Sequence, residues 1–267
     1  MRALLVGLAM LVFTPPFAAV VILASLLGVP EGPDSIYQRL ARRWASILVR
    51  AGGVTVRVHG GERRRATTPV VYVANHVSWY DVFAIASVLP RWSFVAKAEL
   101  RRIPIFGRGA EAVGTVFIER ENRKAAFATY DRAAARVRAG ASVVVCPEGT
   151  RGDSYALRPF KKGPFVLAIA SQVPLVPVIV HGTRDVMPRG SWAVRGGAVD
   201  LHFLEPIPTA GLTYADRDAL AARTWLAMAD ALERLYGVAS DRRHARLGAE
   251  PALPAAVPDP AALPGAS

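Results

Sequence analysis

Cysteine and lysine are both scarce in this chain of 267 residues. The single cysteine, Cys146, excludes an intramolecular disulfide, so nothing in the sequence points to an oxidising compartment. Cys146 ends the apolar run 143–146, and we expect it to be a small buried side chain. Lysine occurs only at positions 97, 124, 161 and 162, so arginine carries most of the positive charge.

Acidic residues are in the minority, with 21 against 33 basic residues, which gives a formal net charge of +12. A basic surface suits anionic lipid headgroups, phosphorylated substrates or nucleic acid. A preference for arginine can equally reflect a GC-rich genome, so the charge alone does not select a partner. Apolar residues make up 52% of the chain, which excludes chain-wide disorder, and the length fits one α/β domain with appendages.

Charged residues are absent between Ala3 and Val29, a stretch long enough to cross the apolar core of a bilayer. A signal peptide is the competing interpretation, because a basic residue precedes the apolar run. The run is long for a signal peptide, however, and no small-residue cleavage site stands before Gly32. We therefore predict a membrane-embedded segment at the N-terminus.

The pair Pro15-Pro16 divides this apolar run near its middle, and prolines break or kink helices. Two arrangements follow: one kinked span, or a hairpin of two short helices at 3–13 and 17–29. Arginines flank the run on both sides, at positions 2, 39, 42 and 43, which favours the hairpin with both ends on the cytoplasmic side.

A helix is predicted over residues 34–51, because apolar residues recur there at helical spacing and Gly52 follows. The arginines between the apolar positions suit a helix that lies on a membrane surface. An amphipathic helix packed on the domain explains the same pattern.

Short β-branched runs alternate with helical stretches over the rest of the chain. We expect strands at 54–59, 70–74, 93–96, 115–118, 142–146, 175–180 and 199–203. Further helices are expected from Asn122 to Arg138, and from a capping box at Thr213 and Asp216 to Tyr236. This alternation predicts an α/β fold with a mostly parallel mixed sheet flanked by helices.

Three regions result from these patterns. Residues 1–52 are a membrane-associated helical segment, and residues 53–240 are an α/β domain. Residues 241–267 are an Ala/Pro-rich tail without periodicity, which we expect to be disordered.

His76 and Asp81 follow the predicted strand 70–74, at the start of an apolar helix. Five positions on a regular helix turn two side chains about 140° apart, so the pair can meet only if His76 lies in the turn before the helix. Asp81 would then hydrogen-bond one imidazole nitrogen and leave the other free as a base. Ser78 and Asp81 also form a capping box, which explains the aspartate without any chemistry. From this segment alone, both interpretations are equally supported.

A second polar segment, Glu148-Gly149-Thr150-Arg151, follows the predicted strand 142–146. The carboxyl edge of an open α/β sheet is where ligand sites lie. Arg151 can bind a phosphate through two donors, and Glu148 can orient Arg151 or contact an acceptor hydroxyl. A surface turn with a local ion pair explains these residues as well.

Two further cations stand at the ends of predicted strands. Arg120 follows Glu119 and can join the same phosphate site, and Lys97 follows the strand 93–96. In isolation, both are more simply solvated charges. Val176-Pro177-Val178 places a proline within a predicted strand, which suits a sheet edge or a bulge.

Four of these segments together resemble the sequence blocks of the glycerolipid acyltransferases, most of all the 1-acylglycerol-3-phosphate acyltransferases. The segment Asn75–Asp81 resembles their His-x4-Asp block, and Phe117-Ile118-Glu119-Arg120 resembles the second, which more often has aspartate in place of Glu119. Glu148-Gly149-Thr150-Arg151 and Val176-Pro177-Val178 resemble the third and fourth. The blocks occur in the family's order, within residues 70–183.

The resemblance implies an O-acyltransferase domain at 53–240. Its reaction would move a fatty acyl group from an acyl thioester to the free hydroxyl of 1-acylglycerol-3-phosphate, giving phosphatidic acid in phospholipid biosynthesis. It implies His76 as the general base, oriented by Asp81. Substrate-binding roles are implied for Lys97, Arg120, Glu148, Gly149 and Arg151.

Neither a cofactor nor a metal is expected, because acyl-coenzyme A or acyl-acyl carrier protein serves as co-substrate. The expected partners are a membrane lipid acceptor, that thioester donor and the anionic surface of the cytoplasmic membrane, with the catalytic domain facing the cytoplasm. A covalent route through Cys146 or Ser78 competes with direct transfer.

Two other functions remain open from the sequence. One is acyl transfer to another lyso-lipid, such as lyso-ornithine lipid, or to dihydroxyacetone phosphate. The other is a non-catalytic membrane-anchored protein that binds lipid or nucleic acid, although the sequence shows no nucleic-acid surface with interleaved aromatics and no nucleic-acid partner is expected.

Overall fold

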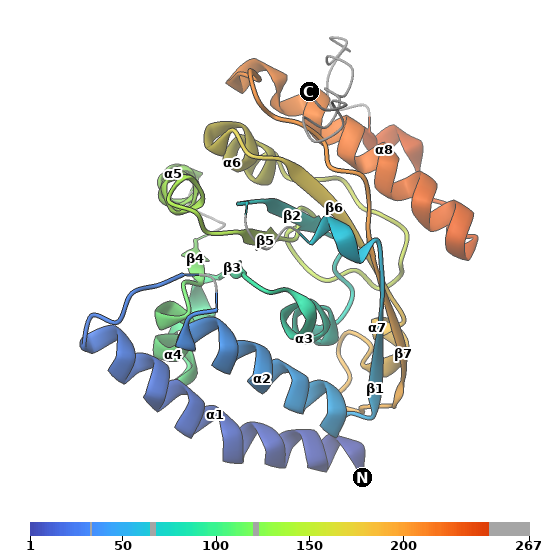
Figure 1. Cartoon of the computed structure of the whole chain (residues 1–267). Coiled ribbons are helices and arrows are strands. Elements are labelled where there is room, and N and C mark those ends of the chain that lie inside the picture. The colour runs from blue at the N-terminus through green and yellow to red at the C-terminus, as the bar shows by residue number, and fades with distance from the viewer. Residues whose placement is uncertain (33, 65–67, 120–122, 246–267) are drawn as a thin grey trace, which may run out of the picture.

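Helices and strands alternate along most of the chain, as the cartoon coloured from the N-terminus to the C-terminus shows (Figure 1). The computed structural model describes residues 1–32, 34–64, 68–119 and 123–245, apart from the side chains of 123–128. The helices are α1 (Arg2–Leu26), α2 (Ile36–Ala51), α3 (Trp79–Val88), α4 (Phe106–Ala112), α5 (Arg123–Arg138), α6 (Gly163–Ser171), α7 (Thr183–Val186) and α8 (Arg217–Tyr236). Short 3-10 helices are η1 (Gly61–Arg63), η2 (Ala98–Arg102), η3 (Tyr214–Asp216) and η4 (Arg242–Ala245). The strands are β1 (Val54–His59), β2 (Val71–Ala74), β3 (Ser93–Lys97), β4 (Val116–Ile118), β5 (Val143–Val145), β6 (Leu175–His181) and β7 (Gly197–Phe203).

One mixed sheet organises the described part of the chain, with the strand order β1-β7-β6-β2-β5-β3-β4. Only the β6–β7 pair is antiparallel among the strand pairs of the described residues. Each predicted strand is present within one or two residues, so the prediction of a mostly parallel mixed sheet flanked by helices is confirmed. The carboxyl ends of β2, β5 and β6 therefore meet at one edge of the sheet.

Both faces of the central strands are covered, because their successive side chains enter different cores. Tyr72 and Ala74 of β2 belong to a core shared with α1, α2 and α3. Val71 and Val73 belong to a second core shared with α5, α6 and α8. All four residues are buried, which explains why this strand reads as a continuous apolar run. Figure 1 shows α2 and α3 on one side of the sheet and α5, α6 and α8 on the other.

Pro177 lies in a central strand, so of the two predicted settings, a sheet edge or a bulge, the bulge is the one that the structure shows. β6 stands between β2 and β7. The pairs Val178–Phe203 and Leu175–Ile207 enclose one more residue on the partner side than on β6, which is the mark of a bulge. The carbonyl of Pro177 accepts from Leu204 N within this irregular stretch. The proline is tolerated because no regular ladder bond is required from it there.

α1 is one continuous helix, so the prediction of a hairpin broken at Pro15-Pro16 was wrong. Its buried residues, Val6, Ala9, Ala18, Val21 and Ala24, occur both before and after the prolines. They pack on α2 and α4. Because both halves dock on the same surface, tertiary packing holds the helix together despite the donors that the prolines remove.

α2 is packed between α1 and α3 rather than placed freely on a surface. It begins two residues later than the predicted 34–51, and it ends before Gly52 as predicted. Ala45 and Leu48 are fully buried against the neighbouring helices. Trp44 Nε1 donates to Thr14 Oγ1 at 3.0 Å, which fastens the middle of α1 next to its proline pair.

The predicted capping box before α8 is present, since Thr213 N donates to Asp216 Oδ2 at 2.7 Å, and the helix ends at Gly237 with φ 66°. The predicted start of the disordered tail at 241 was too early. Residues 242–245 form η4, and Ala245 is buried. The predicted tail beyond 245 and the predicted helix cap at Asn122 lie outside the described residues.

Candidate active site

His76 lies in the turn between β2 and α3, where the spacing to Asp81 required it. The turn is anchored by Asn75, whose side chain donates to the Val180 carbonyl at 2.9 Å and accepts from Val180 N at 2.8 Å. These bonds tie the end of β2 to β6. α3 then begins at Ser78, whose Oγ accepts from Tyr80 N at 3.1 Å. His76 is therefore fixed outside the helix, facing its first turn.

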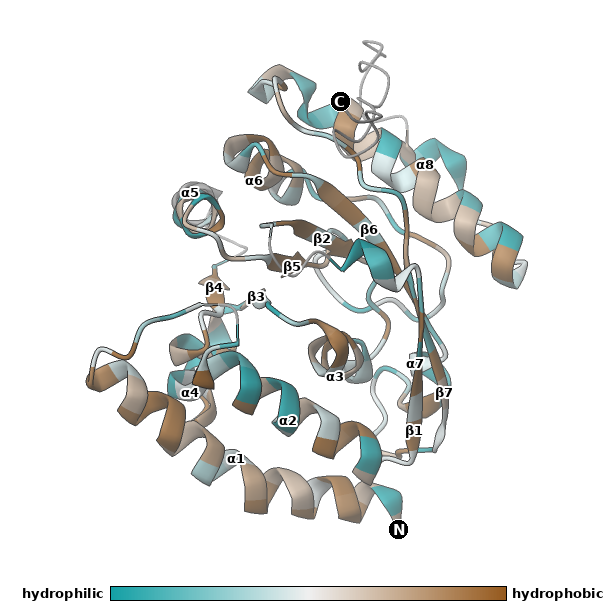
Figure 2. Cartoon of the chain, in the orientation of Figure 1, coloured by the Kyte–Doolittle hydropathy of each residue, from teal (hydrophilic) through white to brown (hydrophobic). Residues whose placement is uncertain are grey.

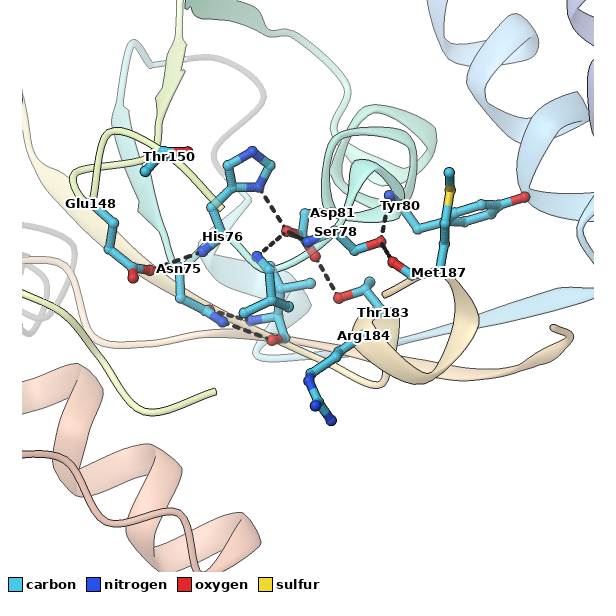
Figure 3. A network of polar contacts seen from close by, with 12 residues as sticks. Asn75, His76, Ser78, Tyr80, Asp81, Glu148, Thr150, Thr183, Arg184 and Met187 are labelled. Carbon is cyan, nitrogen blue, oxygen red and sulfur yellow. Dashed lines mark hydrogen bonds and ion pairs between the residues drawn. The ribbon is translucent and has the colours of Figure 1, made fainter. Parts of the chain in front are cut away.

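Asp81 makes the contacts of both alternatives that the sequence had left open. Its Oδ2 accepts from Ser78 N at 2.8 Å, which completes the capping box. The same oxygen is 2.7 Å from His76 Nδ1 and accepts from Val77 N at 2.7 Å. Figure 3 shows these contacts converging on one carboxylate. The Asp81 side chain is fully buried, whereas His76 keeps 17% of its side-chain surface exposed.

The tautomer of His76 follows from these contacts. Oδ2 of Asp81 already accepts two backbone N–H groups, so it acts as an acceptor toward His76 as well. Nδ1 of His76 therefore carries a hydrogen, and in the neutral imidazole Nε2 keeps a free lone pair. In Figure 3, Nε2 points away from Asp81, and among the described residues it has no hydrogen-bond partner. The geometry is that of an oriented general base.

Thr183 also belongs to the site, and the sequence analysis missed it. Its hydroxyl donates to Oδ1 of Asp81, and both side chains are buried. Thr183 starts α7 directly after β6. Because β6 runs parallel to β2, the residues after both strands meet at one sheet edge. That proximity was the signal that could have identified Thr183.

Glu148 is turned inward and pairs with Arg158 rather than with Arg151, which was one of the two partners that the sequence offered. Its Oε1 accepts from His76 N at 3.1 Å, and its Oε2 pairs with Arg158 Nε at 3.0 Å. Only 2% of the side-chain surface is exposed. Burial raises the pKa of Glu148, although the His76 N–H and the Arg158 guanidinium act against that rise. Glu148 thus holds the backbone of His76.

Arg151 lies over the ring of Trp79, at 4.9 Å from its centroid, next to the turn that holds His76. Among the described residues no carboxylate pairs with its guanidinium, in contrast to Arg158. Gly149 precedes Thr150 and Arg151 and has φ 77°, a backbone conformation that residues with a side chain rarely adopt. The neighbouring Gly152 N donates to the His76 carbonyl at 2.7 Å, which joins the two loops.

The other predicted cations do not complete a phosphate site in the described structure. Lys97 is exposed and pairs with Glu99 at 2.8 Å. Arg120 lies outside the described residues. Of the predicted phosphate ligands, Arg151 is therefore the one that the described structure brings next to His76.

A covalent route through Ser78 does not fit the geometry. The hydroxyl of Ser78 is fully buried, accepts from Tyr80 N and donates to the Met187 carbonyl at 2.8 Å. It is used in capping and is closed to a substrate. Cys146 is half-buried rather than buried as predicted.

A separate cluster of potential metal ligands lies on β1 and β7. Ligand atoms of His59, Asp200 and His202 lie within 4.8 Å of one another in the described part of the chain. The two imidazole rings are stacked at 4.2 Å with an angle of 9°, so their nitrogens do not converge on one point. Arg57 binds both oxygens of Asp200, and His202 Nε2 pairs with the Tyr236 hydroxyl at 2.6 Å. These residues therefore act as an ion-pair and stacking cluster that joins the sheet to α8.

Comparison with known proteins places the chain in a family. A family model described as Acyltransferase matches residues 55–181. A 1-acyl-sn-glycerol-3-phosphate acyltransferase of Haemophilus influenzae is 32% identical over 185 residues, covering 68% of this chain and 76% of that protein. A lyso-ornithine lipid O-acyltransferase of Pseudomonas aeruginosa is 33% identical over 195 residues, covering 67% of this chain and 74% of that protein.

Other relatives are longer than this chain. Human 1-acyl-sn-glycerol-3-phosphate acyltransferase beta is 37% identical over 170 residues, which cover 63% of this chain and 61% of the human protein. The chain spans about the same share, 61%, of a relative from Caenorhabditis elegans. The fold is shared with the crystal structure of the 1-acyl-sn-glycerophosphate acyltransferase of Thermotoga maritima, with a TM-score of 0.75, 24% identity and coverage of 90% of this chain and 97% of that one. The chain therefore belongs to the acyltransferase family, together with proteins named 1-acyl-sn-glycerol-3-phosphate acyltransferases.

Proposed function

We propose that this chain transfers a fatty acyl group from an acyl thioester to the free hydroxyl of 1-acylglycerol-3-phosphate, forming phosphatidic acid for phospholipid biosynthesis. The observation that carries the proposal is His76, whose Nδ1 is held by buried Asp81 at 2.7 Å while Nε2 has no hydrogen-bond partner among the described residues. The membership of the acyltransferase family supports it.

The reaction follows from this geometry. The acceptor hydroxyl donates to Nε2 of His76, and its oxygen attacks the thioester carbonyl carbon as His76 takes the proton. Asp81 stabilises the imidazolium that forms. Collapse of the tetrahedral intermediate breaks the carbon–sulfur bond, and the thiolate takes the proton from His76. All atoms are accounted for with the chain's own residues and the two substrates.

The acceptor headgroup is a further part of the proposal. Arg151 has a planar guanidinium that can donate two hydrogen bonds to a phosphate, and it stands beside the turn that holds His76. Its lack of a carboxylate partner among the described residues leaves those donors available. A relative named for lyso-ornithine lipid makes that acceptor the second candidate.

Replacing Arg151 with alanine tests the phosphate assignment. We expect KM for 1-acylglycerol-3-phosphate to rise by about tenfold to a hundredfold, because a hydrogen bond to a charged group contributes about 1.5–3 kcal/mol. An acceptor without phosphate should show little change. The measurement is initial-rate kinetics with both acceptors.

Arg243→Ala is the matched control, because Arg243 is exposed on η4 and pairs only locally with Asp241. It should leave both acceptors unaffected. If Arg151→Ala weakens both acceptors equally, the phosphate assignment is wrong. An Arg120→Ala variant tests the second predicted phosphate ligand in the same assay.

A membrane location fits this lipid substrate, and we propose that α1 provides it. Among the described residues, α1 is the one helix whose length and apolar composition would suffice to cross a bilayer. Yet it is docked along the domain at both ends of its length, and the opposite side exposes large apolar residues, among them Leu4, Leu8 and Leu11. Figure 2 shows the hydrophobic colouring along the helix. We propose that α1 lies against the membrane with its exposed apolar side while its other side stays packed on the domain, and that the domain faces the cytoplasm.

Glutamates on the exposed side of α1 should release the protein from membranes. For the triple variant Leu4→Glu, Leu8→Glu and Leu11→Glu, we expect vesicle binding to fall by at least about a hundredfold, because each buried leucine contributes about 1.5–3 kcal/mol. Flotation with vesicles containing anionic lipid measures the bound fraction. The double variant Leu226→Glu and Leu235→Glu changes exposed leucines of α8 and should bind normally. Unchanged binding of the triple variant would refute α1 as the contact.

The acyl transfer itself is tested with the full chain in detergent. A panel of acceptors contains 1-acylglycerol-3-phosphate, lyso-ornithine lipid and a lysophospholipid without a terminal phosphate, each offered with acyl-coenzyme A and with acyl-acyl carrier protein. Mass spectrometry of the products identifies acceptor and donor together. Formation of acylated ornithine lipid alone would replace the proposed acceptor. Lipid binding without any product, unaffected by His76→Ala, would show a non-catalytic protein.

A further inference from the structure

The two oxygens of Asp81 have different surroundings. Oδ2 accepts from His76 Nδ1, Val77 N and Ser78 N, all at 2.7–2.8 Å. Oδ1 accepts from the hydroxyl of Thr183, which is the only partner of that oxygen among the described residues. The orientation of the carboxylate plane thus depends on two groups of donors from different parts of the chain.

Burial makes the Thr183 hydroxyl hard to replace. Asp81 and Thr183 both have no exposed surface. Removing a donor from a buried charged acceptor leaves that acceptor without its hydrogen bond, and this costs more than the same loss at a surface. The carboxylate would then have to turn or rearrange to satisfy Oδ1.

The turn that delivers Thr183 is specifically built. Gly182 has φ 91°, and a Cβ at this position would lie 2.2 Å from the Ala198 carbonyl oxygen of β7. Only glycine fits both conditions. α7 then places Thr183 on Asp81 and, at its far end, the Met187 carbonyl on the Ser78 hydroxyl. This short helix and the residue after it therefore hydrogen-bond both members of the capping box, Ser78 and Asp81, as Figure 3 shows.

We propose that Thr183 is a positioning residue for acyl transfer. Its hydroxyl holds the Asp81 carboxylate in the orientation in which Oδ2 accepts from His76 Nδ1. The same hydrogen bond stabilises the negative charge of Asp81 while His76 carries the proton of the acceptor hydroxyl. Thr183 touches neither substrate, so it acts through Asp81. This inference rests on the proposed function and adds to it a residue outside the four sequence blocks.

Thr183→Val removes the hydroxyl and keeps the shape of the side chain. We expect kcat to fall by about tenfold to a hundredfold, the value of one hydrogen bond to a charged group. KM for both substrates should stay within about twofold, because the ground-state contacts are unchanged. Thr183→Ser should restore most of kcat.

Thr224→Val is the matched control. Thr224 is equally buried, and its hydroxyl donates to the Leu220 carbonyl at 2.8 Å within α8, away from the site. This variant should keep kcat near the wild-type value. Thermal unfolding of all variants reports stability separately. Should Thr183→Val fail to fold, the comparison of Thr183→Ser with Thr183→Ala isolates the hydroxyl instead.

The Asp81→Asn background separates positioning from a general structural effect. If Thr183 acts through Asp81, Thr183→Val should add little to the loss already caused by Asp81→Asn. Full additivity of the two losses, or a Thr183→Val kcat equal to that of the wild type, would overturn the inference. A wild-type protein without acyl transfer would instead refute the proposed function, so the two failures are distinguishable.

Discussion

Replacing His76 with glutamine is expected to lower kcat by about a hundredfold to ten-thousandfold, the range that a positioned general base contributes. The reason is that Nε2 is the free basic atom of an imidazole whose other nitrogen is held at 2.7 Å by Asp81. The variant should fold normally, because His76 belongs to a turn and is partly exposed. Initial rates of phosphatidic acid formation and a thermal unfolding curve measure the two effects.

The control for this prediction is Cys146→Ala, which removes the remaining candidate for a covalent intermediate. Direct transfer predicts nearly wild-type kcat for this variant. Loss of activity in Cys146→Ala together with retained activity in His76→Gln would reverse the assignment and place the chemistry on the thiol.

Replacing Asp81 with asparagine is expected to lower kcat by about a thousandfold to ten-thousandfold, because a neutral amide does not stabilise the imidazolium and favours the wrong tautomer. Unlike His76→Gln, this variant should also lose stability. Asp81 accepts the backbone N–H groups of Val77 and Ser78 at the start of α3, and the amide oxygen of asparagine accepts them without the negative charge, which stabilises a helix N-terminus by about 0.3–1 kcal/mol. The melting temperature should fall by about 2–4 °C for each kcal/mol lost.

Asp216→Asn is the control that separates helix capping from the orientation of a base. Asp216 completes the capping box with Thr213 and has no contact with His76. It should lower the melting temperature without lowering kcat. If Asp81→Asn instead melts like the wild type, the negative charge of Asp81 does not stabilise the helix start, and if it keeps wild-type kcat, Asp81 does not orient the base.

The centre of the fold was predictable from sequence because its signals are local. β2, β5 and β6 are short β-branched runs whose residues are buried on both faces, so each stands out as an apolar segment. The position of His76 outside α3 followed from helical geometry alone. The choice between capping and a contact to His76 at Asp81 could not be made, because a carboxylate oxygen can accept several donors and both contacts occur at once.

Contacts between distant segments were beyond the sequence. Thr183 meets Asp81 across 102 positions, and no spacing rule connects them. Glu148 has two arginines close by in sequence, and only the course of the loop decides that it binds Arg158 while Arg151 turns to Trp79.

α1 shows the same limit for a whole helix. Its proline pair would break an isolated helix, but burial on α2 and α4 from both halves compensates for the lost donors.

One carboxylate caps the start of α3 and contacts His76. The orientation of the His76 ring therefore depends on whether the helix start is intact. Local opening of the first turn of α3 would free the backbone donors of Val77 and Ser78, and Asp81 would swing out of reach of Nδ1 in the same event. A partly opened molecule of this kind would hold an untethered imidazole and would be a poor catalyst for unwanted substrates, water included. Any change that opens the first turn of α3 should therefore lower the activity and the stability of the helix start together.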